Sequence, residues 1–499
     1  MPQKFYITTA IPYASGDPHI GHFLEFIQAD VLARYHRLQG EEVFFLTGTD
    51  EHGIKIAEYA VKAGKTPDRF VSEIAEKFQN IADALRISYS YFIRTTNQQK
   101  HWPNVRKIWE LLADNGDIYK GHYKGKYCVG CEKYVTESDL ENGLCPFHQK
   151  PPEELDEDNY FFRLSRYQDQ LRQLIISDEV KILPGFRKQE VLSFIDRGIQ
   201  DVSFSRPKEK LNWGIPVPGD ESQVIYVWAD ALTNYLSGVD FAEAGVTFQR
   251  WWPPDVQIVG KDIWRFHALY WPAMLLSAHL PLPKVLFVHG FVTVGGEKIS
   301  KSLGNGIDPI AIMQKFSVDA DAVRYFFLRE MSPVEDGDYT DEKFITRYNG
   351  DLANGIGNFL ARVNQLGVLG RGTIALNTNT FQDAIVAAYN DYAKAMQEFR
   401  FNEALVFASQ LVKIGDGYIN EQKPWELLKS GTDEAHERFN QHISSLTLLL
   451  GNIAQLLTPF MPATAEKILI AIGLAGQVPD AWQGKTVTFQ SLSPLFPRK

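Results

Sequence analysis

The sequence predicts an α/β fold for the first part of the chain and an all-α fold from about Thr346 onward. Residues 4–10 (KFYITTA) and 41–49 (EEVFFLTGT) have the β-branched and aromatic composition of strands, and residues 21–40 between them carry apolar side chains at helical spacing. After Thr346, long amphipathic stretches are broken only by Gly and Pro, and no convincing strand is predicted before the last dozen residues. These observations indicate a βαβ start and a separate helical domain.

An insertion interrupts the predicted α/β domain. After Asn115 the periodicity breaks into short segments around the cysteines, and the acidic run PPEELDED and the helical stretch SRYQDQLRQLIIS follow. Strand and helix signals return in SQVIYVWADALTNYL, VQIVGKDIWRFHALYWPAMLLSA and KVLFVHGFVTVGGEKIS, so we expect one sheet to be completed from two separated halves. The predicted domains are the two halves of the α/β domain (residues 1–115 and 223–310), the inserted domain (116–222), a linking segment (311–345) and the helical domain (346–499).

Composition and charge restrict the class of protein. With 499 residues, 44% apolar composition and 13% aromatic residues, the chain can bury several cores and is not disordered. The N-terminus lacks the pattern of a secretory signal, and the apolar stretches are too short to cross a membrane, so we expect a soluble cytosolic protein. The net charge is -10, and the acidic excess lies within residues 1–345, which argues against a protein that coats nucleic acid non-specifically.

A nucleotide-binding site is predicted in TTAIPYASGDPHIGHF, near the N-terminus. Gly16 and Pro18 shape a loop between a strand and a helix, and His19, Gly21 and His22 lie where that helix begins. Backbone N–H groups and the positive end of the helix favour an anion there, and the two imidazoles can donate to phosphate oxygens. The pattern H-x-G-H alone is equally compatible with histidines that only begin a helix.

A second motif, GGEKISKSLGN, follows an apolar strand much later in the chain. Gly295 and Gly296 predict a tight turn, and Lys298 and Lys301 flank serines on a polar loop, where two ammonium groups can close over a polyphosphate. A loop of this composition is more often a solvated turn. Its occurrence together with the H-x-G-H loop favours a function in nucleotide chemistry.

The motifs PHIGH and KISKS resemble the two signatures of class I aminoacyl-tRNA synthetases, and the surrounding residues are similar to the methionyl-tRNA synthetase family along nearly the whole chain. The resemblance implies a doubly wound parallel-sheet nucleotide-binding domain split by an insertion with a zinc knuckle, then a helical-bundle anticodon-binding domain. It also implies that methionine and ATP give methionyl-adenylate and pyrophosphate, and that the methionyl group passes to the 3′ end of tRNA(Met). A C-terminal dimerisation domain found in some relatives is absent, so we expect a monomer.

The resemblance implies the roles of the nucleotide-binding residues. His19, Gly21 and His22 would hold the phosphates, Lys298 and Lys301 would engage them in the transition state, Asp262 would accept a hydrogen bond from a ribose hydroxyl, and Mg²⁺ would accompany ATP. The first step needs no protein nucleophile. It requires that the methionine carboxylate be aligned with the α-phosphate while the developing charge is neutralised.

Methionine is expected in an apolar, aromatic pocket with one acid for its ammonium group. The resemblance assigns the acid to Asp50, and its position after a predicted strand fits a ligand crevice. It assigns Arg206 to the acid-lined part of the site and the remaining pocket positions to Ile11, Tyr13, Trp228, Ala231, Tyr235, Ile263, Phe266 and His267. Each aromatic taken alone is more often a core residue. Leu232 stands where many family members carry proline.

The helical domain is expected to read the tRNA. Asn358 and Arg362 are four residues apart and share a helix face, where they can contact base edges. Pro424 can open a helix, and Trp425 beside it can stack on an unpaired base. These assignments rest on the resemblance, because a surface pair and a buried Trp are the ordinary alternatives. The family implies a CAU anticodon.

All three cysteines lie between Tyr127 and Lys150 with the spacing C-x₂-C, thirteen residues, then C-x₂-H. Cys128, Cys131, Cys145 and His148 therefore offer four ligands for one tetrahedral structural Zn²⁺. A closed shell of protein ligands leaves no open position for catalysis. We expect a clasp that positions the inserted domain over the tRNA acceptor end, with His122 as the only nearby substitute ligand.

Other functions remain open at this stage. The cysteine enzyme of the same class would scatter its zinc ligands around the active site, and the leucine, isoleucine and valine enzymes need a large editing insertion for which this chain has little room. A small nucleotidyltransferase would not need the helical domain, and a non-catalytic zinc-dependent RNA-binding module would leave the KISKS loop without a role. Amino-acid-dependent exchange between pyrophosphate and ATP distinguishes these possibilities.

Overall fold

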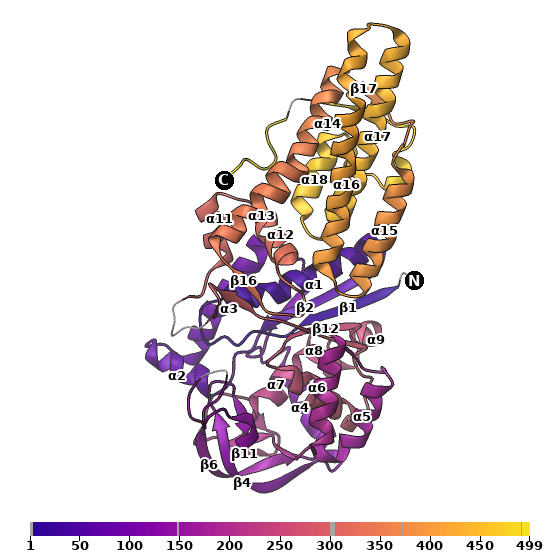
Figure 1. Cartoon of the computed structure of the whole chain (residues 1–499). Coiled ribbons are helices and arrows are strands. Elements are labelled where there is room, and N and C mark those ends of the chain that lie inside the picture. The colour runs from indigo at the N-terminus through magenta and orange to yellow at the C-terminus, as the bar shows by residue number, and fades with distance from the viewer. Residues whose placement is uncertain (1–2, 147–148, 300–304, 371–372, 491) are drawn as a thin grey trace. The chain divides into compact units, whose positions relative to one another are not determined.

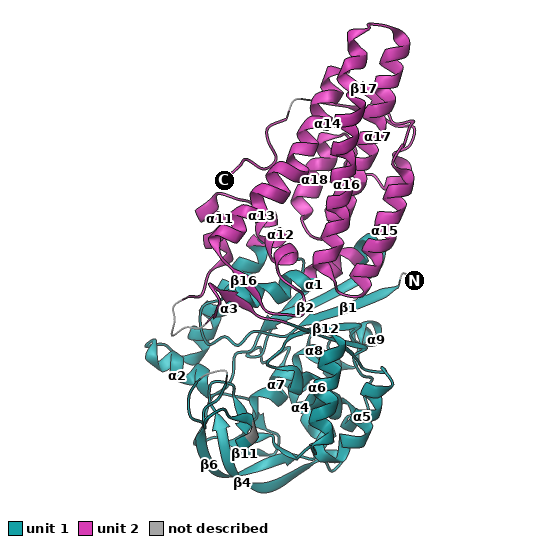
Figure 2. Cartoon of the chain, viewed as in Figure 1, with its two compact units in different colours: residues 1–29, 36–83, 87–289 teal, residues 30–35, 84–86, 290–499 magenta. Residues whose placement is uncertain are grey.

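The computed structural model describes residues 3–146, 149–299, 305–370, 373–490 and 492–499. The chain forms two compact units (Figure 2), of which unit 1 contains residues 1–29, 36–83 and 87–289 and unit 2 contains residues 30–35, 84–86 and 290–499. The predicted linking segment, 311–345, lies in the same compact unit as the helices that follow it.

Unit 1 is built on a six-stranded parallel sheet with the strand order β3-β2-β1-β12-β13-β7. Its strands are β1 (Lys4–Thr9), β2 (Glu42–Thr49), β3 (Tyr91–Arg94), β7 (Lys181–Leu183), β12 (Val256–Gly260) and β13 (Val285–His289). Every residue of β12 is buried, as expected for a strand in a parallel sheet that is covered on both faces. The prediction of a doubly wound sheet completed from separated halves is confirmed.

Helices connect the strands of this sheet and surround it (Figure 1). They are α1 (Ile20–Leu38), α2 (Ile54–Lys62), α3 (Pro67–Ala84), α4 (Trp102–Asp114), α5 (Gln168–Ile176), α6 (Gly185–Asp196), α7 (Val227–Leu232), α8 (Asn234–Ser237), α9 (Val246–Trp251) and α10 (Trp271–Ser277), with the π-helix η4 (Phe266–Tyr270) and the short 3₁₀ helices η1 (Glu137–Asp139), η2 (Leu164–Tyr167) and η3 (Phe241–Glu243). In α3, Pro67 occupies the first position and Val71, Ile74 and Phe78 bury one helical face, which explains where the helix begins and how it packs.

The inserted segment forms a four-stranded sheet with the order β5-β4-β6-β8. Its strands are β4 (Ile118–Cys128), β5 (Lys133–Val135), β6 (Glu153–Phe162) and β8 (Val202–Ser203). The acidic run PPEELDED enters strand β6, where Glu154 lies opposite Lys126 and Asp156 lies opposite Lys124. These cross-strand pairs of opposite charge explain why an acidic run forms a strand.

Two strands differ from the sequence expectation. The stretch SQVIYV forms most of β11 (Asp220–Ile225), which does not join the central sheet but pairs antiparallel with β9 (Ser205–Pro207) and β10 (Pro216–Val217). Its first residues are exposed, so it suits a small sheet with one open face better than a parallel sheet. Strand β7, from within the predicted insertion, extends the central sheet beside β13 instead.

Unit 2 contains a small sheet and a group of helices. The strands β14 (Val292–Val294), β15 (Glu297–Lys298) and β16 (Gly337–Tyr339) form the sheet, and the helices are α11 (Pro309–Phe316), α12 (Ala320–Glu330), α13 (Asp341–Arg347), the π-helix η5 (Tyr348–Gly357), α14 (Asn358–Leu369), α15 (Gln382–Gln397), α16 (Phe401–Gln422), η6 (Pro424–Lys429), α17 (Asp433–Leu457), α18 (Pro462–Ala471) and η7 (Pro479–Ala481). Helices α14, α16 and α17 lie alongside one another (Figure 1). A short strand missed by the sequence, β17 (Thr373–Ala375), pairs with β18 (Thr486–Thr488).

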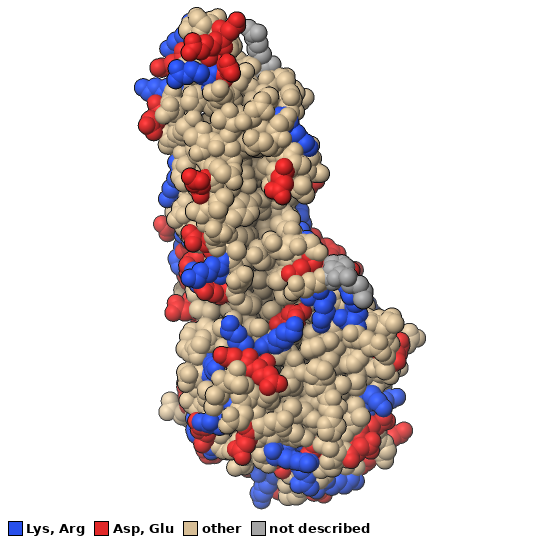
Figure 3. Space-filling view, turned by 90° about the vertical axis from the view of Figure 1, so that its right-hand side faces the viewer, with Lys and Arg blue, Asp and Glu red and all other residues tan. Residues whose placement is uncertain are grey.

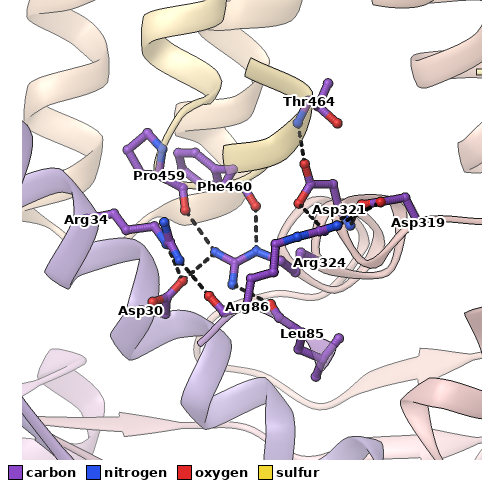
Figure 4. A network of polar contacts seen from close by, with 10 residues as sticks. All are labelled: Asp30, Arg34, Leu85, Arg86, Asp319, Asp321, Arg324, Pro459, Phe460 and Thr464. Carbon is purple, nitrogen blue, oxygen red and sulfur yellow. Dashed lines mark hydrogen bonds and ion pairs between the residues drawn. The ribbon is translucent and has the colours of Figure 1, made fainter. Parts of the chain in front are cut away.

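A buried arginine organises the polar core of unit 2 (Figure 4). Arg324 of α12 is 0% exposed, and its guanidinium donates to the carbonyl oxygens of Phe460, Pro459 and Leu85 at 2.8, 2.9 and 3.2 Å. Its Nη2 also lies 2.7 Å from Oδ2 of Asp30, which is itself fully buried. Burial lowers the pKa of Arg324, and the Asp30 charge opposes this shift. One side chain therefore joins three separate parts of the chain within unit 2.

Charged side chains of both signs are mixed on the face drawn in Figure 3, and among the described residues there neither sign gathers into one extended patch. Together with the net charge of -10, the mixed charges of this face give no support to non-specific coating of nucleic acid. Within the part of the chain that the structure describes, no helix combines the length and apolar character needed to traverse a bilayer.

Candidate active site and metal centre

The strand order places a ligand crevice at the carboxyl ends of β1 and β12. These two strands are neighbours, yet the chain continues from β1 toward β2 on one side and from β12 toward β13 on the other. Loops that leave the sheet in opposite directions open a crevice at such a switch point. The loop that carries His19 follows β1, and Asp262 follows β12 and is exposed. Two predicted nucleotide-binding residues of unit 1 therefore lie at this crevice.

His19 and His22 form a stacked pair at the start of α1. Their ring centroids are 3.9 Å apart with an interplanar angle of 25°. The backbone N–H of His19 donates to Nδ1 of His22, and the backbone N–H of Gly21 donates to Nδ1 of His19, both at 3.2 Å. Because each Nδ1 accepts, each neutral ring carries its proton on Nε2. The pair thus presents two N–H donors, as contact with phosphate oxygens requires.

A buried histidine–carboxyl pair at the same crevice was not predicted from the sequence. Nε2 of His289, the last residue of β13, lies 2.8 Å from Oε2 of Glu25 on α1. Burial raises the pKa of Glu25, and the nearby Asp262 charge adds to the shift. The signal available in the sequence was that Glu25 lies three residues after His22, hence on the same face of the helix.

Asp50 lies directly after β2 and has an unsatisfied buried oxygen. Its backbone is fixed by hydrogen bonds with Pro12 and Ala14 at 2.9 and 2.8 Å, and its side chain is 8% exposed. Oδ1 has no hydrogen-bond partner in the described structure. Burial, and then the charge of Asp230, raise the pKa of Asp50 well above its ordinary value. A cationic group at Oδ1 would satisfy both the oxygen and its charge.

A buried aromatic cluster is formed by residues of α7, α8 and the segment that leads into α10, where the methionine pocket is predicted. Trp228 stacks on Phe266 with ring centroids 3.7 Å apart and an interplanar angle of 3°. Nδ1 of His267 donates to the Ile263 carbonyl at 3.0 Å, and its Nε2 lies 2.7 Å from the Tyr235 hydroxyl, which donates to it. Burial lowers the pKa of His267 to about 4, so the ring is neutral near pH 7.

Most of the predicted pocket residues are therefore brought together. Ile11 and Tyr13 pack against the same buried cluster, and Ala231 and Leu232 are buried in α7. The Trp228 Nε1–H has no hydrogen-bond partner in the described structure. A mostly apolar pocket with a few unsatisfied polar atoms is typical of a small-molecule site.

Arg206 has a different environment. Its Nε lies 2.7 Å from Oε1 of the buried Glu157, and its guanidinium lies 4.7 Å from the centre of the Tyr127 ring. Both partners belong to the inserted segment, close in sequence to the cysteines. Its Nη1 has no hydrogen-bond partner within the described residues. Glu157 is thus the acid that Arg206 pairs with in the structure.

The three cysteines form a candidate metal centre. The sulfur atoms of Cys128, Cys131 and Cys145 all lie within 4.8 Å of one another, and those of Cys131 and Cys145 are 3.5 Å apart. The hydrogen bond with Cys128 and burial raise the pKa of the Cys131 thiol well above its ordinary value when no cation is present. Three clustered sulfurs suit a soft or borderline metal ion. His148, the predicted fourth ligand, lies outside the described residues.

His122 does not join the cysteines. It lies on β4 with its Nε2 3.0 Å from Asp156 and its Nδ1 2.9 Å from Asp158, both on strand β6. These two acids raise its pKa, with the hydrogen bond to Asp158 making the larger contribution. A role as substitute metal ligand is not supported by this geometry.

The second motif begins as a hairpin in unit 2. Gly295 and Gly296 have φ angles of 61° and 81°, which glycine adopts without strain, and Asp338 accepts from the Gly296 N–H at 2.7 Å. The predicted tight turn is confirmed. Lys298 is exposed in β15, and its Nζ lies 5.1 Å from the centre of the Phe291 ring. Lys301 lies outside the described residues.

The predicted anticodon residues lie on neighbouring elements of unit 2. Asn358 is exposed at the first position of α14, and Arg362, one turn later, bonds Asp416 at 2.7 Å and Asn420 at 2.6 Å, both on α16. Trp425 is 37% exposed in η6, just beyond the end of α16. The Arg362 side chain is thus fixed, whereas an exposed indole can receive a stacked base.

Comparison with known proteins gives the same picture for both parts of the chain. A family model described as "tRNA synthetases class I (M)" matches residues 5–154 and 131–364, and one described as "Anticodon binding domain of methionyl tRNA ligase" matches residues 370–493. A methionine–tRNA ligase from Thermotoga maritima is 40% identical over 93% of this chain and 74% of its own length. The Rhizobium meliloti methionine–tRNA ligase is 41% identical over 99% of this chain and 98% of its own.

Among solved structures, Mycobacterium tuberculosis methionyl-tRNA synthetase in complex with methionyl-adenylate matches with a TM-score of 0.92 and 36% identity, covering 99% of this chain and 100% of that one. The switch-point crevice with its paired histidines, and the Gly-Gly hairpin that opens the lysine motif, define a class I aminoacyl-tRNA synthetase. Within that class, the chain belongs to the methionyl-tRNA synthetase family.

Proposed function

We propose that this protein is a methionine–tRNA ligase that activates L-methionine with ATP and transfers the methionyl group to the 3′ end of tRNA(Met). The observation that carries the proposal is the buried, unpartnered Oδ1 of Asp50, close to the α7 helix that bears Trp228. One cation-binding acid beside an aromatic, apolar pocket matches an amino acid with an unbranched thioether side chain.

For methionine, the ammonium group would pair with Asp50 and the thioether would enter the pocket of Trp228, Phe266 and His267. Sulfur–aromatic contacts contribute about 0.3 to 1.5 kcal/mol each. The neutral His267, held by Tyr235 and the Ile263 carbonyl, adds a polar wall without a charge. Ile11, Tyr13, Ala231 and Ile263 would complete the walls, and the unsatisfied Nη1 of Arg206 would extend the polar side of the site.

For ATP, the proposed ligands in unit 1 are His19, Gly21, His22 and Asp262. The carboxylate oxygen of methionine attacks the α-phosphorus, the bond from that phosphorus to the bridging oxygen breaks, and pyrophosphate leaves. The Nε2–H groups of His19 and His22 donate to phosphate oxygens as charge develops there. On the strength of the KISKS motif, Lys298 and Lys301 take part in neutralising the phosphates. Mg²⁺ would supply further positive charge with ATP.

The experiment that tests the function is amino-acid-dependent exchange between pyrophosphate and ATP. We expect methionine to stimulate exchange and leucine and cysteine to give at most a small fraction of that rate. Stimulation by cysteine or leucine in place of methionine would show that another amino acid is the substrate. No stimulation by any amino acid would exclude synthetase activity.

The tRNA contacts predict a selective defect. Trp425→Ala should lower kcat/KM for charging tRNA(Met) by about 10- to 100-fold, because base stacking on an aromatic ring contributes about 1 to 3 kcal/mol. Exchange should remain unchanged, since activation does not require tRNA. Ile470→Ala, another exposed apolar side chain of unit 2, is the control. A loss of exchange in Trp425→Ala, or normal charging by that variant, would contradict the proposed anticodon-binding role of Trp425. The same role is proposed for Asn358 and Arg362.

We further propose that the cysteine cluster holds one structural Zn²⁺ with His148 as fourth ligand. Cys145→Ser should reduce bound zinc from about one ion per chain and lower the thermal midpoint of unfolding. His122→Ala, which leaves the sulfurs in place, should keep its zinc. Metal analysis by inductively coupled plasma mass spectrometry checks both variants, and zinc retained by Cys145→Ser or lost from His122→Ala would refute this ligand set.

A further inference from the structure

A buried carboxylate behind the pocket is bound by two imidazoles. Asp230 of α7 is 1% exposed, and its Oδ2 lies 2.6 Å from Nδ1 of His52 while its Oδ1 lies 2.7 Å from Nε2 of His101. Nδ1 of His101 lies 2.8 Å from the hydroxyl of Ser237 in α8. We call His52, His101, Asp230 and Ser237 the Asp230 cluster. All four residues are at most 2% exposed.

The Asp230 carboxylate is the acceptor in these contacts. Burial acts to raise its pKa, but the charges and hydrogen bonds of His52 and His101 outweigh that effect and lower the pKa of Asp230. An ionised Asp230 needs an N–H from each ring, so His52 donates through Nδ1 and His101 through Nε2. Nδ1 of His101 contacts the Ser237 hydroxyl, which also donates to the Thr233 carbonyl at 3.1 Å. Both carboxylate oxygens and both nitrogens of the His101 ring are therefore engaged.

Three members of the Asp230 cluster, His52, Asp230 and Ser237, adjoin predicted methionine-binding residues. His52 lies two residues after Asp50, and its carbonyl accepts from the Tyr13 hydroxyl at 2.7 Å. Asp230 lies between Trp228 and Ala231 on the single short helix α7. Ser237 lies two residues after Tyr235 on α8. The cluster thus joins the Asp50 loop and the start of α4, where His101 is the N-cap residue, to the consecutive helices α7 and α8.

The cluster also places a second negative charge behind the predicted ammonium site. The Asp230 charge is the next contribution after burial to the raised pKa of Asp50, which shows that the two carboxyl groups interact. A cation bound at Asp50 would therefore be attracted by both carboxyl groups. It would contact Asp50 directly, whereas Asp230 would act from behind, held by the two imidazoles.

We propose that Asp230, held by His52 and His101, is a positioning residue that fixes the geometry and charge of the methionine pocket. This inference rests on the proposed function, in that methionine is the occupant of the pocket. It assigns no contact with the substrate to the cluster, and it predicts that the cluster acts on methionine binding and not on ATP binding.

The test is direct binding of methionine, measured by isothermal titration calorimetry, beside the KM for ATP in exchange. Asp230→Asn and His101→Ala should each weaken methionine binding about tenfold, equivalent to about 1.4 kcal/mol, with the KM for ATP changed less than about twofold. His101→Gln, whose amide can replace the Nε2–H, should recover most of the affinity. His36→Gln, which alters a histidine–carboxylate pair at the carboxyl end of α1, is the control.

Four outcomes decide the inference. Unchanged methionine affinity in Asp230→Asn, or equal losses for methionine and ATP, would overturn it, as would His101→Gln behaving like His101→Ala. Should Asp230→Asn fail to fold, Ser237→Ala, which removes the hydroxyl that contacts His101 and the Thr233 carbonyl, must still weaken methionine binding for the inference to stand. Because binding is measured without catalysis, a protein that binds methionine but shows no exchange would refute the proposed function and leave this inference standing.

Discussion

Asp50→Asn is expected to remove most methionine affinity and at the same time to stabilise the substrate-free protein. Losing one partner of a buried charged pair costs about 2 to 5 kcal/mol, so the dissociation constant for methionine should rise by at least about 30-fold. The substrate-free protein, by contrast, buries the Asp50 carboxyl group with an unpartnered Oδ1. The same carboxylate therefore lowers stability and confers binding.

The pH dependence of this effect follows from the raised pKa of Asp50. A carboxyl with a raised pKa binds its proton more tightly in the folded state than in the unfolded chain, so its ionisation near pH 7 opposes folding. Asn carries no charge, and the variant should have the higher free energy of unfolding at neutral pH. Below the ordinary Asp pKa of about 4, where the carboxyl is neutral in both states, the difference should disappear.

Calorimetric binding of methionine and thermal unfolding at pH 7 and at acidic pH check both effects. A matched control is Asp17→Asn, which changes an exposed carboxylate in the loop between β1 and α1. A lower thermal midpoint for Asp50→Asn at pH 7, or unaltered methionine affinity, would show that Asp50 is structural and not a ligand-binding group.

Arg324→Ala is expected to be the most destabilising single change in unit 2. It removes one of the two guanidinium groups that pair with the buried Asp30, leaving Arg34 at 2.7 Å, and it removes the donors to the carbonyl groups of Phe460, Pro459 and Leu85 (Figure 4). Removing one member of a buried charge network in this way costs about 3 to 5 kcal/mol, because the buried carbonyl and carboxylate oxygens lose donors that water cannot replace. The thermal midpoint of unfolding should fall by on the order of 10 °C.

Differential scanning calorimetry measures this effect, and Arg86→Ala supplies the comparison. Arg86 belongs to the same network, but its side chain is 37% exposed; it pairs with the similarly accessible Asp319 at 2.6 Å and, at the longer distance of 3.3 Å, with the buried Asp321. Exposed pairs contribute about 0 to 1 kcal/mol, so its loss should be small. If Arg324→Ala were no more destabilising than Arg86→Ala, the network would not hold the core of unit 2.

The sequence predicted the elements whose signal is local. Strands β1 and β2 and helix α1 follow from periodicity, and the Gly295–Gly296 turn follows from composition. The spacing of the three cysteines predicted their clustering, which the structure confirms. The resemblance carried by PHIGH and KISKS added the aromatic pocket, and the contacts of Trp228, Phe266 and His267 agree with it.

Other features depended on pairing between distant segments. The membership of β7 in the central sheet and of β11 in a small one could not be read from the residues, because a strand pattern reports burial and not partners. Glu25 and His289 are far apart in the chain, so their contact could likewise be seen only in the folded protein. The pairing of Arg206 with Glu157 also appears only in the folded chain.

The sequence by itself thus determined the chemistry that this protein carries, since the histidines, lysines and cysteines of its motifs are set at fixed short spacings that local backbone geometry preserves. The tertiary structure alone decided which buried polar groups meet. Asp230, His52 and His101 come from three separate stretches, and no periodicity predicts that their side chains share hydrogen bonds. Burying a charge is costly unless its partners are in place, so such contacts arise only when the whole core has formed.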